Sequence, residues 1–161
     1  MTKLFRSAAL AALLCATSLS GAMAAEDAFY LGQWKITEAV PGPWIKSEAE
    51  LFPDEVKSLV GQTLTISADA IEGPGGFPCK GPKYEVIEGG PDMLFQGAFG
   101  EMQAKDAASD PQKLAEKVGF AGTQYRTVLT GCEFAVDFSI GADKDTMMFA
   151  LDNSVYVMKR Q

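Results

Sequence analysis

The sequence predicts a mainly β fold, a small antiparallel barrel of about 7–8 strands with two short helices and one disulfide. Three observations lead to this fold class. Apolar and polar residues alternate with a period of two in several segments, the segments with helical features are short, and glycine and proline lie between these segments. The chain has 161 residues, and we expect a single domain once an N-terminal leader is removed.

The alternation is clearest near the C-terminus. In 132–140 one face of the predicted strand carries Cys132, Phe134, Val136, Phe138 and Ile140, and the opposite face carries Glu133, Asp137 and Ser139. A register shift of one residue would expose the whole apolar set, so its burial tests the prediction. Further strands are expected at 28–38, 63–68, 83–88, 124–130, 146–151 and 154–159, with Asp152-Asn153 as the turn between the last two.

Two short helices are expected at 53–60 and 111–118. A proline suits the first position of each helix, and Gly61 or Gly119 suits the position after its last turn. Residues 73–82 contain four glycines and three prolines, which predicts a loop and no strand.

The apolar segment 92–100 allows two interpretations. It is either an inner strand or a segment whose Phe95 and Phe99 line an opening. Large apolar residues usually lie inside a protein, so the inner strand is favoured.

The N-terminal 24 residues have the pattern of a cleaved signal peptide. Two basic residues precede an unbroken apolar run over 8–16, and Ala-Met-Ala at 22–24 is a small-residue cleavage site. The apolar run is too short to span a bilayer. We therefore expect cleavage after residue 24, no membrane anchor, and a mature barrel domain of residues 25–161 in the periplasm or outside the cell.

Cysteine usage supports the same compartment. Cys15 leaves with the leader, and the mature chain retains Cys79 and Cys132. In an oxidising compartment an even pair predicts one disulfide, with two reduced thiols as the alternative. The bond requires the two Cα atoms to lie within about 7 Å of each other.

Charge limits the possible partners. The leader holds two of the 14 basic residues and none of the 21 acidic ones, so the mature chain has a formal charge of −9. Binding of phosphate needs a cationic surface, and we expect neither nucleic acid nor an anionic membrane as a partner. A cationic protein would be attracted.

The chain contains no histidine. This removes Ser-His-Asp and Cys-His nucleophiles, His-ligated zinc or copper, and His-ligated haem. Met147 and Met148 point to opposite faces of a strand and cannot hold copper together. Three acidic pairs lie in predicted loops, helix starts or turns, where carboxylates favour solubility. They are Glu48/Glu50, Asp54/Glu55 and Asp143/Asp145. We expect no enzyme, no cofactor and no metal site.

The mature sequence opens with FYLGQW at 29–34. A Gly-x-Trp on the first strand soon after a signal peptide resembles the start of lipocalin-type (calycin) barrels, and it also occurs in avidin-like chains and some small bacterial periplasmic inhibitors. The resemblance implies that Gly32 and Trp34 close one end of the barrel, because the glycine lets the strand bend and the tryptophan has a large surface. The Thr-Asp-Tyr and late-arginine motifs of typical lipocalins are not evident in the sequence.

Five aromatic residues are candidates for contact with a ligand or partner. They are Trp44, Tyr84, Phe95, Phe99 and Tyr125. Trp44 follows Pro-Gly-Pro in a predicted loop, and loop aromatics are often used for contacts. The alternative is that Trp44 folds over the open end of the barrel.

The expected function is that of an exported, non-catalytic and monomeric binding protein. It would sequester a small apolar ligand, or inhibit a hydrolase such as a lysozyme or protease through its end loops. The alternative is a structural or stress-related envelope protein that acts through a protein partner. An empty barrel favours ligand carriage, and a filled barrel with a rigid projecting loop favours inhibition.

Overall fold

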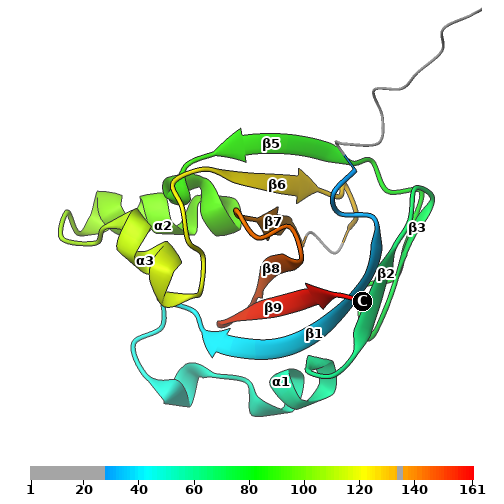
Figure 1. The fold of residues 1–161 in the computed structure, drawn as a ribbon. Helices are drawn as coiled ribbons and strands as arrows, with labels where there is room; N and C mark the ends of the chain where they lie inside the picture. Colours follow the sequence, from blue (N-terminus) through cyan, green and yellow to red (C-terminus); the bar gives the residue numbers. More distant parts are fainter. Residues whose placement is uncertain (1–27, 134–135) are drawn as a thin grey trace, which may run out of the picture.

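The structure is a computed structural model that describes residues 28–133 and 136–161. The predicted signal peptide and Phe134 lie outside the described residues. Within the described ranges, nine strands form one antiparallel sheet that curls into a half-barrel (Figure 1). The strands are β1 (Gly32–Pro41), β2 (Thr63–Ile66), β3 (Ala70–Glu72), β4 (Cys79–Lys80), β5 (Glu85–Gly89), β6 (Tyr125–Leu129), β7 (Phe138–Ile140), β8 (Thr146–Leu151) and β9 (Ser154–Arg160). The predicted fold class is confirmed.

The strands follow the order of an up-and-down barrel. The sheet order is β4-β3-β2-β1-β9-β8-β7-β6-β5, so chain neighbours pair with each other and β9 returns to pair with β1. Between β4 and β5 no strand pairing is recorded for the described residues. The barrel is therefore open at this one step, on the side opposite the β1–β9 pair.

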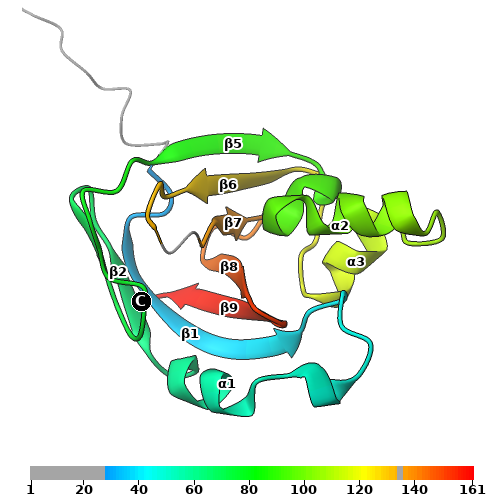
Figure 2. The ribbon, with the colours of Figure 1, turned by 180° about the vertical axis from the view of Figure 1, so that it is seen from behind.

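Three helices accompany the sheet, seen from opposite sides in Figures 1 and 2. They are α1 (Pro53–Leu59), α2 (Leu94–Lys105) and α3 (Pro111–Lys117), and single 3-10 turns occupy Glu48–Glu50 and Pro91–Met93. The two predicted helices correspond to α1 and α3, and both begin with proline as expected. The carboxylate of Asp110 accepts a 3.0 Å hydrogen bond from the backbone N–H of Gln112 and caps α3.

The interior of the half-barrel is filled by side chains. Trp34, Phe138, Phe149, Tyr156 and Met158 are at most 1% exposed and belong to one cluster of contacting residues. The ring of Phe149 stacks on that of Tyr156 with centroids 4.9 Å apart. The same ring lies 5.2 Å from that of Phe77, which comes from the loop before β4. Side chains from distant parts of the sheet thus meet inside, as in a close-packed core.

A second apolar cluster covers the outer face of the sheet. Met148 and Val155 point outward from β8 and β9 and pack with Leu114 of α3 and Phe99 of α2. Met147, the neighbour of Met148, lies in the interior cluster. The predicted alternation of these two methionines is therefore confirmed, and the helices α2 and α3 explain why an outer sheet face is apolar.

Trp34 is fully buried beneath the N-terminal segment. Its indole N–H donates a 2.8 Å hydrogen bond to the carbonyl of Tyr30. The guanidinium of Arg160, at the end of β9, lies 4.2 Å from the centre of the indole ring and donates to the carbonyls of Leu31 and Phe29. A late arginine that the sequence analysis does not find thus packs on the tryptophan of the first strand.

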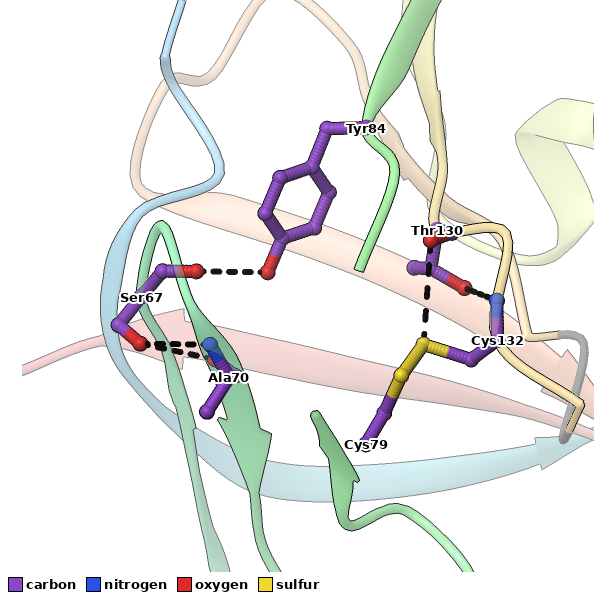
Figure 3. The surroundings of a disulfide bond; sticks show 6 residues. All are labelled: Ser67, Ala70, Cys79, Tyr84, Thr130 and Cys132. Carbon is purple, nitrogen blue, oxygen red and sulfur yellow. Dashed lines mark hydrogen bonds between the residues drawn. A yellow bond between two sulfur atoms is a disulfide. The ribbon is translucent and has the colours of Figure 1, made fainter. Parts of the chain in front are cut away.

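The disulfide joins the two sides of the open step. Cys79 of β4 is bonded to Cys132, which follows β6, with Cα atoms 6.1 Å apart, as predicted (Figure 3). Nearby, the hydroxyl of Tyr84, just before β5, donates a 2.8 Å hydrogen bond to the carbonyl of Ser67 in the β2–β3 turn. A covalent bond and a hydrogen bond therefore hold the two edges together where strand pairing is missing.

Four local predictions are wrong. The strand expected over 132–140 is shorter, because β7 begins only at Phe138. The segment 92–100 is not an inner strand but a 3-10 turn and the first half of α2, because its apolar residues repeat at helical spacing when followed on to Met102. The loop at 73–82 contains the two-residue strand β4, whose residues lie between prolines and pair with β3. Ser139 was expected on an exposed face but is 1% exposed, and its hydroxyl is 2.8 Å from that of Thr127.

Candidate functional site: a pocket beside the β8–β9 hairpin

A pocket with a volume of about 490 Å³ lies between α2, the segment before β7 and the tip of the β8–β9 hairpin. We call it the hairpin pocket. Its lining residues are Trp44, Phe95, Gln96, Ala98, Glu101, Met102, Lys105, Val136, Asp137, Ala150, Leu151 and Asp152. The volume is in the range of small-molecule sites. The pocket is the place where a loop tryptophan, a helix and a hairpin tip meet.

Trp44 forms one aromatic wall of the pocket. Its indole N–H donates a 3.3 Å hydrogen bond to the carbonyl of Asp152 at the hairpin tip. Its ring lies 6.0 Å from that of Phe95 and 6.4 Å from that of Phe99. A Cβ on Gly42 would lie 2.4 Å from the indole, so only glycine leaves room for this position of Trp44.

The turn that carries Phe95 is strained. Phe95, Gln96 and Gly97 have φ values of 53°, 60° and 83°, a left-handed turn that precedes the regular part of α2. Left-handed backbone at non-glycine residues costs about 1–3 kcal/mol each and is found preferentially at functional sites. Here the turn places the ring of Phe95 beside Trp44 and the side chain of Gln96 at the carboxylate of Asp137. The strain lies at the edge of the pocket.

Acidic groups provide most of the charge of the pocket. Asp137 accepts a hydrogen bond from Gln96, and its partial burial raises the pKa of its carboxyl above the ordinary value while the hydrogen bond opposes this change. Lys105 is 3.4 Å from Glu101 on the same helix, so these two charges offset each other. For Asp137 and Asp152 no ion pair within 4 Å involves a described residue.

Glu55 of α1 contacts the far side of the hairpin tip. The hydroxyl of Tyr156 donates a 2.6 Å hydrogen bond to Glu55. Burial raises the pKa of Glu55, and the neighbouring carboxylate of Asp152 adds to this rise, against the opposing effect of the Tyr156 hydrogen bond. The contact fixes the hairpin tip against α1, and it places Asp152 between Glu55 and the pocket.

The structure brings together three of the five predicted contact residues. Trp44 and Phe95 line the hairpin pocket, and Phe99, fully buried, packs behind both rings. Tyr84 lies at the open step beside the disulfide, where burial raises its pKa to about 12. Tyr125 is buried under the helices, and its hydroxyl donates to the carbonyl of Gly122. These two tyrosines are not part of the pocket.

Sequence reasoning missed the polar residues of the pocket. The strand pattern predicts Asp137 on a solvent-facing strand surface and Gln96 within an apolar strand, whereas the structure brings the two side chains together at the pocket. One signal was available, because an acid between Val136 and Phe138 interrupts an otherwise apolar run. The contact between Gln96 and Asp137 joins segments about forty residues apart, so no pattern of neighbouring residues predicts it.

We predict that Asp137→Asn leaves the midpoint of thermal unfolding at pH 7 unchanged or raises it. The pKa of Asp137 is raised in the folded state, so its stabilising contribution is complete below the ordinary aspartate pKa and is lost as the pH rises through the higher folded value. Asparagine does not titrate, and it can still bond to Gln96. The other charged groups at the pocket, Glu101, Lys105 and Asp152, are unchanged in the variant.

Thermal unfolding of both proteins at about pH 3 and about pH 7 measures the effect. The advantage of the variant should be larger at the higher pH, and Asp69→Asn, on the exposed β2–β3 turn, is the control. A variant that is less stable than the native chain at neutral pH would contradict the predicted cost of this carboxylate.

Among the described residues, no helix is long and apolar enough to cross a membrane, and no group of three or more acidic or cysteine residues is arranged to hold a metal ion. Comparison of the chain with family models, with curated proteins and with solved structures finds no match.

Proposed function

We propose that this chain is an exported, non-catalytic binding protein that holds a small, partly apolar ligand in the hairpin pocket. The observation that carries the proposal is the difference in packing between the barrel interior and the hairpin pocket. The interior of the half-barrel is packed with aromatic side chains, whereas the hairpin pocket is open and has the aromatic walls of Trp44 and Phe95. A ligand would therefore bind beside the hairpin and not inside the barrel.

Several features support this proposal. Small-molecule pockets are concave, mostly apolar and carry a few convergent polar groups, as this one does. The strained turn at Phe95 is maintained at the edge of the pocket. The chain contains no histidine, which removes the commonest acid–base catalyst.

Export forms part of the same proposal. Its support is the leader-like sequence of residues 1–24 and the disulfide, because such bonds persist in oxidising compartments. We also propose a lipocalin-type relationship. Its support is the up-and-down strand order, with Gly32 and Trp34 on the first strand and Arg160 packed on the tryptophan.

We predict that Ala98→Phe abolishes ligand retention. Ala98 faces the pocket from α2, and a phenyl ring there would occupy the space between Trp44 and Leu151. The protein is expressed with its leader in a bacterial host, purified from the periplasm and examined by native mass spectrometry. The native chain should retain a small-molecule adduct, and Ala98→Phe should lose it.

Ala104→Phe is the matched control, because Ala104 lies on the same helix and is exposed outside the pocket. It should retain the adduct at the level of the native chain. Absence of any small molecule from the native chain, or equal retention by Ala98→Phe, would overturn ligand binding in this pocket.

A second candidate function is inhibition of a hydrolase, which a packed interior together with a rigid projecting turn favours, and α2 and α3 project together from the barrel (Figures 1 and 2). The turn between them is held by Asp106, whose carboxylate and carbonyl accept hydrogen bonds from the N–H groups of Ala108 and Ser109 at 3.0 and 2.8 Å. A rigid turn of small residues could enter an active-site cleft. Inhibition assays with lysozyme and proteases test it, and Ala108→Trp should remove the effect while leaving retention of a pocket ligand unchanged.

A further inference from the structure

The hairpin pocket combines aromatic walls with uncompensated negative charge. Asp137 and Asp152 both line it, and neither has a cation within 4 Å among the residues that the structure describes. The cation of the pocket, Lys105, already pairs with Glu101 at 3.4 Å. Asp137 accepts a hydrogen bond from Gln96 and Asp152 lies beside the carboxyl of Glu55, so the negative charge of both aspartates is left without a cationic partner in the described part of the chain.

The aromatic residues of the pocket suit a cation as well. The faces of tryptophan and phenylalanine rings attract ammonium and guanidinium groups, and tryptophan does so most strongly. The chain already contains two such contacts, Arg160 over Trp34 and Arg126 over Phe29. Trp44 and Phe95 are in edge-to-face contact at the pocket, with centroids 6.0 Å apart and an interplanar angle of 63°, so a group in the pocket beside them meets two differently oriented rings.

Ligands of other charge fit the pocket less well. An anion would be repelled by Asp137 and Asp152. A neutral apolar ligand would cover the partly buried carboxylate of Asp137 without providing a partner, which costs free energy. A cation compensates the carboxylates, and its apolar body can rest on Met102, Val136 and Leu151.

We propose that the ligand of the hairpin pocket is an organic cation, an ammonium or guanidinium group on a short apolar body. The inference rests on the proposed function, because it names the chemical class of the ligand at that site. The acidic mature chain, with its formal charge of −9, favours the approach of such a cation. The group is supplied either by a free amine or by a lysine or arginine side chain of a protein partner, and both sources have the same chemistry.

Isothermal titration calorimetry with four probes tests the proposal. Benzylammonium represents a free cation, and benzyl alcohol is a neutral aromatic of the same size. Capped lysine amide and capped arginine amide represent a partner's side chain. Benzylammonium should bind about tenfold more tightly than benzyl alcohol. Tighter binding of the free cation than of the capped amino acids assigns a small amine, and the reverse assigns a protein side chain.

We predict that Asp137→Asn weakens binding of the tightest cation about tenfold and leaves binding of benzyl alcohol unchanged or makes it slightly tighter, because the variant removes the buried charge that a neutral ligand would cover. Asp69→Asn is the control and should bind all probes as the native chain does. Added salt should weaken binding of the cation and not that of the alcohol. An unfolded variant is recognised separately by its circular dichroism, and Trp44→Leu supplies a second variant, which should also weaken binding of the cation.

Two outcomes would overturn the proposal. If benzyl alcohol binds as tightly as the cations, or if Asp137→Asn has no effect on binding of the cation, the pocket does not select cations and the inference fails. The proposed function would still stand if the native chain retains a neutral adduct that Ala98→Phe removes. If no probe binds and Ala98→Phe has no effect on retention either, the proposed function fails together with the inference.

Discussion

Replacing Trp34 by alanine is expected to lower the free energy of unfolding by about 4 kcal/mol. Trp34 is fully buried, so truncation to alanine leaves a large cavity in the interior cluster. The variant also loses the hydrogen bond from the indole to Tyr30 and the ring surface on which Arg160 lies. All three losses occur where the N-terminal segment meets the end of β9, so they are not independent and the expected value covers them together.

Urea unfolding followed by far-ultraviolet circular dichroism measures this loss. Trp44→Ala is the matched control, because Trp44 is only partly buried, and a loss of about 1 kcal/mol is expected for it. In the ligand-retention experiment the order of the two variants should be reversed. Trp44→Ala should reduce retention more than Trp34→Ala does, because only Trp44 lines the hairpin pocket. If Trp34→Ala fails to fold, Arg160→Met gives a smaller version of the test, with an expected loss of about 2 kcal/mol. A loss below about 1 kcal/mol for Trp34→Ala would contradict the closing role of this residue.

Removing the disulfide by the double substitution Cys79→Ser and Cys132→Ser is expected to cost about 4 kcal/mol of unfolding free energy. The bond closes a loop of 53 residues, and in the chain-entropy model that loop length corresponds to this value. The location adds a structural reason. β4 has two residues and a single pairing partner, β3, so without the bond this edge of the sheet is held by few hydrogen bonds.

The measurement is urea unfolding of the native chain and the double variant, each with and without a reducing agent. Reduction should destabilise the native chain to the level of the double variant and leave the variant unchanged. Hydrogen exchange should accelerate most at β3 and β4, and Tyr84→Phe should cost about 1 kcal/mol at the same place. Equal stability of all four samples would show that the open step does not depend on the bond.

Much of the fold was predictable because it follows from local pattern. Residues 63–66 alternate between partly buried and buried positions and form β2 within the strand expected at 63–68, and the prolines at the starts of α1 and α3 mark helices that the structure contains. The paired cysteines predicted their own bond. The strand and helix predictions need only a few consecutive residues. The disulfide prediction needs only the count of cysteines, because two cysteines can pair in one way.

The helix α2 could not be predicted from residues 92–100 alone, because the apolar segment ends at Gly100 and α2 continues to Lys105. Residues 92–100 contain two phenylalanines and two glycines, which does not favour a helix, and the helical repeat appears only when Met102 is included. The left-handed turn at Phe95 is also invisible to local propensity, because phenylalanine and glutamine avoid that conformation in isolation. Packing of Phe95 against Trp44, Phe99 and Phe120 offsets its cost.

The β class, the bonded pair of cysteines and the aromatic residues of the pocket could all be predicted from the amino-acid sequence. The packed barrel interior, the position of Arg160 on Trp34 and the shared pocket of Asp137 and Trp44 could be found only in the folded protein. The difference lies in how far apart along the chain the interacting residues are. Strand alternation and helix starts depend on neighbours a few residues apart, whereas the pocket joins a loop, a helix, a segment before a strand and a hairpin tip, and their side chains meet only after the sheet has curled.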